Sequence, residues 1–63
     1  MRTMNKSEQR ALFSLYERSP HSRTTTYRYF RKTQAHYSSL NGCWMVAFCG
    51  MFVGIEADGY THS

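Results

Sequence analysis

Hydrophobic positions in the first part of the chain follow a helical period. In "NKSEQRALFSLYERSP", Asn5 precedes Glu8 by three residues, the spacing of a capping box, and Ser19-Pro20 ends the pattern. This predicts a helix over about residues 5–18. At ~100° per residue, its apolar side chains spread over roughly 200°, about twice the width that one packing layer covers. They are Ala11, Leu12, Phe13, Leu15 and Tyr16.

The next segment, "HSRTTTYRYFRKTQAHYSSLNG", is compatible with a strand or a helix. As a strand it would place Arg31 among aromatic side chains, whereas a helix separates the aromatic residues from the basic ones more cleanly. We therefore predict a second helix over about residues 23–37. Ser22 or Thr24 is the expected N-cap, and Asn41-Gly42 follows the frayed end.

The last third of the chain has the composition of β-strands. No charged side chain occurs from Cys43 to Ile55, and glycines punctuate a run of aromatic and β-branched residues. This predicts strand structure over about residues 43–56. Alternation leaves both faces apolar, with Cys43, Met45 and Ala47 on one and Trp44, Val46 and Phe48 on the other.

A strand that is apolar on both faces needs a packing layer above and below it. Two short helices of one chain cannot easily provide both layers, so we expect two copies to share one core across a two-fold axis. The alternative is an intramolecular hairpin, in which Cys43–Phe48 pairs with Met51–Glu56 around Gly50 and the helices cover it. The predicted fold is therefore α+β: two short helices followed by a strand or short hairpin, in an intertwined homodimer.

Length and charge set further limits. A chain of 63 residues forms one small domain, over residues 1–63, with a marginal core. The net charge of +4 is uneven, because all eight Arg and Lys residues lie between Arg2 and Lys32. The apolar run is far shorter than the ~20 residues of a membrane span, and "MRTMNKSEQR" lacks the apolar core of a secretory signal. We expect a soluble intracellular protein without membrane association.

Metal and catalytic chemistry find little support in the sequence. His36, Cys43, Cys49 and His62 offer four possible ligands for zinc, but the cysteines are too far apart for the usual knuckle. We expect both cysteines to be buried free thiols and predict no metal, cofactor or small-molecule substrate. No third group marks a Cys-His catalytic pair, so we predict that the protein is not an enzyme.

Taken over its full length, the chain resembles a family of small early proteins of lambda-like temperate bacteriophages, encoded between the exonuclease and excisionase genes. The likeness is greatest in "MNKSEQRALFSLYERSP" and "GMFVGIEADGYTHS". The resemblance implies an accessory protein made early in infection, in the host bacterial cytoplasm, that favours lytic development. It implies no catalytic residues.

Two functional hypotheses follow. The first is a homodimeric interaction protein that binds a host or phage regulatory protein through a hydrophobic cleft, because aromatic anchors dominate such interfaces. Its predicted partner-binding or dimer-core residues are Leu12, Phe13, Leu15, Tyr16, Phe30, Trp44, Val46, Phe48, Phe52 and Val53. The alternative is a small nucleic-acid-binding regulator that contacts phosphates through Arg23, Arg28, Arg31 and Lys32. Against it, the helical arrangement puts these charges and the aromatic rings on different faces.

Overall fold

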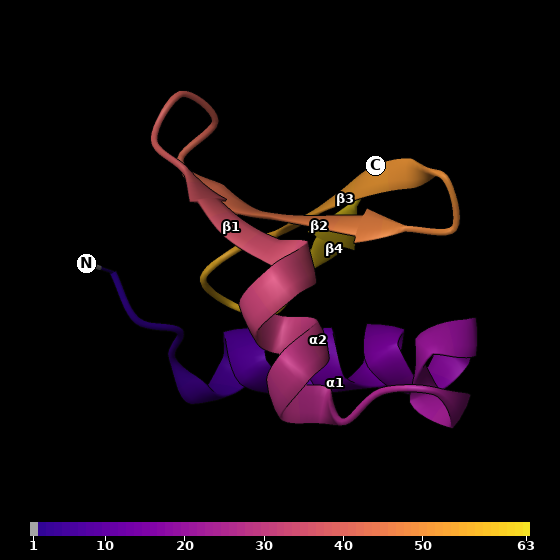
Figure 1. Cartoon of the computed structure of the whole chain (residues 1–63). Helices are drawn as coiled ribbons and strands as arrows, with labels where there is room; N and C mark the ends of the chain where they lie inside the picture. Colours follow the sequence, from indigo (N-terminus) through magenta and orange to yellow (C-terminus); the bar gives the residue numbers. More distant parts are fainter. Residues whose placement is uncertain (1) are drawn as a thin grey trace.

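Helices cover one face of a four-stranded antiparallel sheet in the computed structural model, which describes residues 2–63 (Figure 1). The strands follow one another in space as they do in sequence, in the order β1-β2-β3-β4. The fold is α+β, as predicted. Along the chain the elements are α1 (Lys6–Arg18), the 3-10 helix η1 (Pro20–Arg23), α2 (Tyr27–Gln34), β1 (Ala35–Ser38), β2 (Cys43–Phe48), β3 (Met51–Ile55) and β4 (Thr61–His62).

Helix α1 begins at the capping box that the sequence predicts. The Asn5 side chain accepts a hydrogen bond from the Glu8 amide at 2.8 Å, and the Glu8 carboxylate accepts one from the Asn5 amide at 2.8 Å. Two amides at the helix N-terminus thereby find partners. Of the described residues, no helix is long and apolar enough to cross a membrane.

The bounds predicted for the second helix, residues 23–37, are wrong at both ends. Residues 20–23 form η1, and α2 begins only after Thr26, whose hydroxyl accepts a hydrogen bond from the Tyr29 amide at 3.2 Å. Thr26 is therefore the N-cap, in place of Ser22 or Thr24. β-branched threonines are poor in helix interiors and good at caps, which explains why the helix starts after the third threonine of the run.

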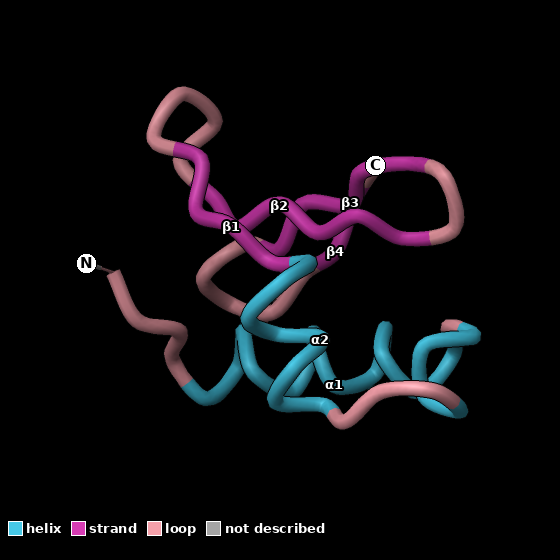
Figure 2. Tube along the Cα trace, viewed as in Figure 1, coloured by secondary structure: helices cyan, strands magenta, loops and turns pink. Residues whose placement is uncertain are grey.

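Residues 35–38, predicted to end the helix, form strand β1 instead. Ala35 lies opposite Val46 and Tyr37 lies opposite Trp44 in an antiparallel pair with β2. Pairing with β2 satisfies backbone groups that a continued helix would satisfy locally, and it also buries Ala35. The tertiary partner therefore overrides the helical pattern. Helix α2 passes directly into β1, with no connecting loop (Figure 2).

Strands β2 and β3 form the intramolecular hairpin. Val46 lies opposite Val53, and the connection is the two-residue turn Cys49-Gly50. Both turn residues have positive φ, 50° at Cys49 and 80° at Gly50, as a type I′ hairpin turn requires. Cys49 is exposed, so the expected burial of both thiols is wrong for Cys49 and right for Cys43.

The core lies between the helices and the sheet. Its most buried members come from α1, α2 and both central strands, so one chain encloses a core without a second copy. Helix α1 contacts β3, α2 and η1, so more than one element packs against its wide apolar arc, although Phe13 stays 43% exposed. The largest fully buried side chains are Phe30, Leu12, Ile55 and Val46.

The opposite face of the sheet carries no helix, and we call it the open face (Figure 1). By the strand register, the side chains on it alternate with those of the core. The open face includes His36, Met45, Ala47, Phe52, Gly54 and His62, with Cys43 at its edge. The predicted homodimer is neither required nor opposed by this arrangement, and it stays a prediction.

Candidate functional site

A large hollow lies between α2, β1, β2 and the segment that precedes α1. Its volume is about 630 Å³, within the ~300–1,000 Å³ range typical of ligand sites. We call it the basic cleft. The side chains that give it its character are Arg2, Arg28, Arg31, Lys32, Tyr37 and Trp44.

Helix geometry brings three of the cations together. Arg28, Arg31 and Lys32 are spaced by three and four residues, so they lie on the same side of α2. Arg2 reaches the cleft from the N-terminal segment, and no Asp or Glu lines it. Four positive charges without an acidic partner in the cleft attract an anionic ligand.

Two aromatic rings from the sheet lie beside these charges. The Arg2 guanidinium carbon lies 4.2 Å from the centre of the Tyr37 ring, a cation–π contact. Tyr37 in turn packs edge-on against Trp44, with ring centres 5.6 Å apart and an interplanar angle of 75°. Tyr37 therefore holds one cation in place and supports the indole behind it.

Trp44 also carries an unpaired donor. Its Nε1 is buried and has no hydrogen-bond partner among the described residues. An unpaired buried donor costs roughly 1–3 kcal/mol and is uncommon in native structures. An acceptor brought by a ligand would recover part of this free energy if the indole shifted to meet it.

The cleft changes one conclusion drawn from the sequence. Within α2 the basic residues and the buried Phe30 do occupy different faces, as expected. The rings that join the charges come from β1 and β2, however, and the N-terminal segment adds Arg2. Arg23, also predicted as a phosphate contact, lies at the end of η1 and does not line the cleft.

The residues predicted for a hydrophobic cleft do not share one surface. Buried core positions hold Leu12, Leu15, Phe30, Val46 and Val53, and Tyr16, Trp44 and Phe48 pack partly buried against them. Phe13 and Phe52 are 43% and 66% exposed, but Phe13 lies on α1 and Phe52 on the open face. No single groove collects these anchors.

An aromatic cluster joins the two helices. The ring centre of Tyr27 lies 5.0 Å from that of Phe13 and 5.6 Å from that of Tyr16, and the Tyr27 hydroxyl donates a hydrogen bond of 3.2 Å to the Gln9 carbonyl. Burial raises the pKa of Tyr27, an effect that the nearby Arg31 partly offsets. The cluster fixes α2 on α1 and so sets the position of the basic cleft.

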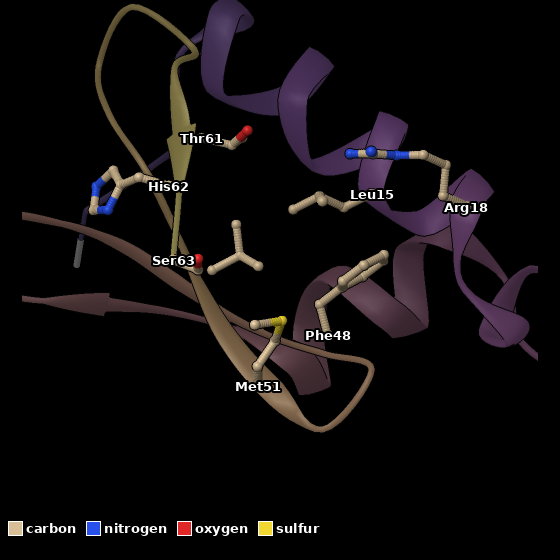
Figure 3. A pocket seen from close by; sticks show the side chains of 8 residues that line it. Leu15, Arg18, Phe48, Met51, Thr61, His62 and Ser63 are labelled. Atoms are coloured by element: carbon tan, nitrogen blue, oxygen red, sulfur yellow. The ribbon is translucent and has the colours of Figure 1, made fainter.

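A smaller hollow lies where α1 meets the sheet (Figure 3). Leu15, Phe48 and Met51 form its apolar wall, and the Arg18 guanidinium carbon lies 5.9 Å from the centre of the Phe48 ring. In Figure 3 the Thr61 side chain points toward α1 and the His62 ring points away from it. The hollow is open to solvent, and no cluster of charged side chains among the described residues lines it.

Of the four side chains considered for zinc on spacing, only Cys43 and His62 meet among the described residues. Glu56, which the spacing did not suggest, completes a group with them on the open face. Comparison with known proteins identifies no relative: no family model matches the chain, and no similar curated protein or solved structure was found.

Proposed function

We propose that this protein is a non-enzymatic binding module whose basic cleft binds single-stranded nucleic acid. The observation that supports this most directly is the combination of four cationic side chains and two aromatic rings in one cleft without an acidic residue. Phosphates pair with the cations, and this contact supplies most of the affinity of a nonspecific nucleic-acid complex.

Single-stranded nucleic acid suits the cleft better than a duplex. Unstacked bases can lie against aromatic rings or against the planes of arginine guanidinium groups, whereas the bases of a duplex are already stacked. Arg2, held over Tyr37, offers such a plane beside Trp44. We infer that one base packs in the cleft and that its flanking phosphates face Arg28, Arg31 and Lys32.

The hydrophobic-cleft hypothesis has less support, because its anchors are dispersed between core, α1 and the open face. Self-association is the second candidate, favoured by the 66% exposure of Phe52 on a sheet face that no helix covers. A second copy would cover this face with the same face of its own sheet. This would leave the basic cleft of each copy, which lies on the helix side, open to ligand.

The resemblance to early phage proteins suggests where such binding would act. We propose that the protein works in the host bacterial cytoplasm early in infection and favours lytic development. It would do so by binding nucleic acid itself or by meeting a host or phage regulatory protein on the bound strand.

Trp44 makes the proposal testable without a label. It is the only tryptophan of the chain and it lines the cleft, so its fluorescence reports a bound ligand. A titration with single-stranded oligonucleotides should quench or shift this emission. The logarithm of the affinity should fall with the logarithm of salt concentration with a slope of about −0.7 for each phosphate contact.

Two arginines provide a matched comparison. Arg31→Ala should lower affinity and reduce the magnitude of the salt slope by about 0.7, whereas Arg10→Ala, on α1 and outside the cleft, should change neither. Tyr37→Leu should weaken binding by removing the support of Arg2. The proposal fails if an acidic peptide of equal charge binds with the same dependence on Arg31 while oligonucleotides do not bind.

A further inference from the structure

Three side chains that can ligate a metal converge on the open face. Cys43 of β2, Glu56 just after β3 and His62 of β4 each offer one ligand atom, and these atoms all lie within 4.8 Å of one another. The His62 Nε2 lies 2.6 Å from the Glu56 Oε2. Cys43 is only 3% exposed, so the group has a buried thiol on its inner side and an exposed pair on its outer side.

Gly54 creates the space in which this group meets. It lies on β3 between its neighbours on β2 and β4, opposite Met45 and His62. A Cβ atom at this position would lie 2.6 Å from the His62 Cε1 and 3.3 Å from the Cys43 Sγ. The imidazole therefore lies over bare backbone, and any larger residue would displace it from the thiol.

Neighbouring side chains hold the ligands in place. The Tyr60 ring stacks on the His62 ring, with centres 6.1 Å apart and planes inclined by 24°. The Met45 Sδ, on the same face of the sheet, lies 3.8 Å from the Cys43 Sγ. A thioether thus lies beside the thiol of the group, and an aromatic ring lies beside its imidazole.

We propose that Cys43, Glu56 and His62 bind a zinc ion, with a water molecule as the fourth ligand. Thiolate, imidazole and carboxylate are the three ligand types that zinc takes in proteins. Zinc bonds of ~2.0–2.3 Å in a tetrahedron separate the ligand atoms by about 3.3–3.8 Å. Side-chain rotations that widen the 2.6 Å contact between His62 and Glu56 would bring the group to this geometry.

The ion would fasten the end of the chain to the middle of the sheet. Strand β4 has two residues and pairs only with β3, whereas zinc would link it to β2 across β3. The hydrophobic core lies on the other face, so the fold does not depend on the ion. Removal of zinc with a chelator should therefore leave helical circular dichroism unchanged and loosen β4 alone.

Cobalt(II) is the probe that tests the site, because a thiolate ligand gives it a charge-transfer band in the near ultraviolet. The full reduced chain should bind one cobalt ion with this band, and zinc, but not magnesium, should abolish the band by displacement. Cys43→Ser should lose the band, whereas Cys49→Ser, which removes the thiol in the exposed turn, should retain it. Absence of the band in the native chain, or its persistence in Cys43→Ser, would overturn the proposal.

A second comparison avoids changing the buried thiol. Gly54→Ala keeps all three ligands but pushes His62 aside, so it should weaken cobalt binding at least tenfold while the helices remain folded. His62→Gln should have the same effect, whereas His36→Gln, on β1 of the same face, should have none. Zinc should slow amide exchange in β4 of the native chain. Equal binding by Gly54→Ala and the native chain would refute the assigned geometry.

Discussion

The side-chain amide of Asn5 donates a hydrogen bond of 3.0 Å to the carbonyl oxygen of Ala57, a residue 52 positions further along the chain. The side-chain oxygen of the same asparagine accepts the hydrogen bond that caps α1. Gly59 comes close to α1 at the same place, since a Cβ there would lie 3.1 Å from the Ser7 carbonyl oxygen. One side chain thus starts the first helix and anchors the turn that leads into β4.

Substitution of Asn5 should separate these two roles. Asn5→Ala removes both and should lower the free energy of unfolding by about 1–2 kcal/mol. Asn5→Asp keeps the capping oxygen and loses only the donor to Ala57, so its loss should be smaller, and amide exchange should quicken chiefly around residues 56–60. Urea denaturation and exchange measurements test this. The other asparagine, Asn41, provides the control, because Asn41→Ala in the β1–β2 turn should have little effect on either measurement.

Cys49, in the turn between β2 and β3, has a strained backbone conformation that a substitution can relieve. Cys49 has a φ of 50°, which a side chain other than Asn, Asp or Gly adopts reluctantly. Cys49→Asn creates the favoured Asn-Gly pair of a type I′ turn and should raise the free energy of unfolding by roughly 0.5–1 kcal/mol. Cys49→Val, which is β-branched, should lower it. Equal stability of the two variants would contradict this account of the turn.

Alkaline pH should destabilise the protein through Tyr27. Because burial raises its folded-state pKa, the neutral phenol is favoured in the folded chain. The stabilisation of the folded chain by Tyr27 is complete below the pKa of about 10 of the unfolded chain, and it is lost as pH rises through the higher pKa of the folded chain. Tyr27→Phe should lower the free energy of unfolding at neutral pH by about 0.5–1.5 kcal/mol, because the hydrogen bond to the Gln9 carbonyl is lost. The same variant should show a smaller decrease in the free energy of unfolding as pH rises above neutral. Tyr60→Phe, at an exposed ring, is the control.

Self-association should appear as a dimer in sedimentation at micromolar concentration, with a melting temperature that rises with protein concentration. Val46 is fully buried, so Val46→Lys should abolish the fold by burying an unpaired charge. Phe52→Asp should instead give a folded monomer if the copies meet through their open faces, and an unfolded chain if they share one core. A native chain that is monomeric, with concentration-independent melting, would contradict the dimer.

Local signals predicted the parts of the fold that depend on neighbouring residues. The capping box at Asn5 and the glycine at the β2–β3 turn each act over a few positions, so the sequence reveals them directly. The end of α2 could not be found this way, because Ala35 is extended only through its pairing with Val46. A helical pattern that continues past residue 34 carries no trace of that partner.

The candidate sites were harder to predict for the same reason. The basic cleft draws its charges from α2 and its rings from β1 and β2, and the position of Arg2 follows no pattern in the sequence. Cys43, Glu56 and His62 meet through the register of three strands, not through a short motif. Gly54 was identifiable as a glycine in a strand, but its purpose depends on His62 lying above it.

The absence of a loop between α2 and β1 has a consequence for how the cleft can respond to a ligand. Gln34 ends the helix and Ala35 begins the strand, so no flexible residue separates the cations of α2 from the ring of Tyr37. A swing of the helix relative to the sheet would have to break the pairing of Ala35 with Val46. We therefore expect the backbone of the cleft to be preorganised, so that only its long side chains reorient when a ligand binds. A glycine inserted after Gln34 should weaken binding, because it would let α2 move relative to the sheet.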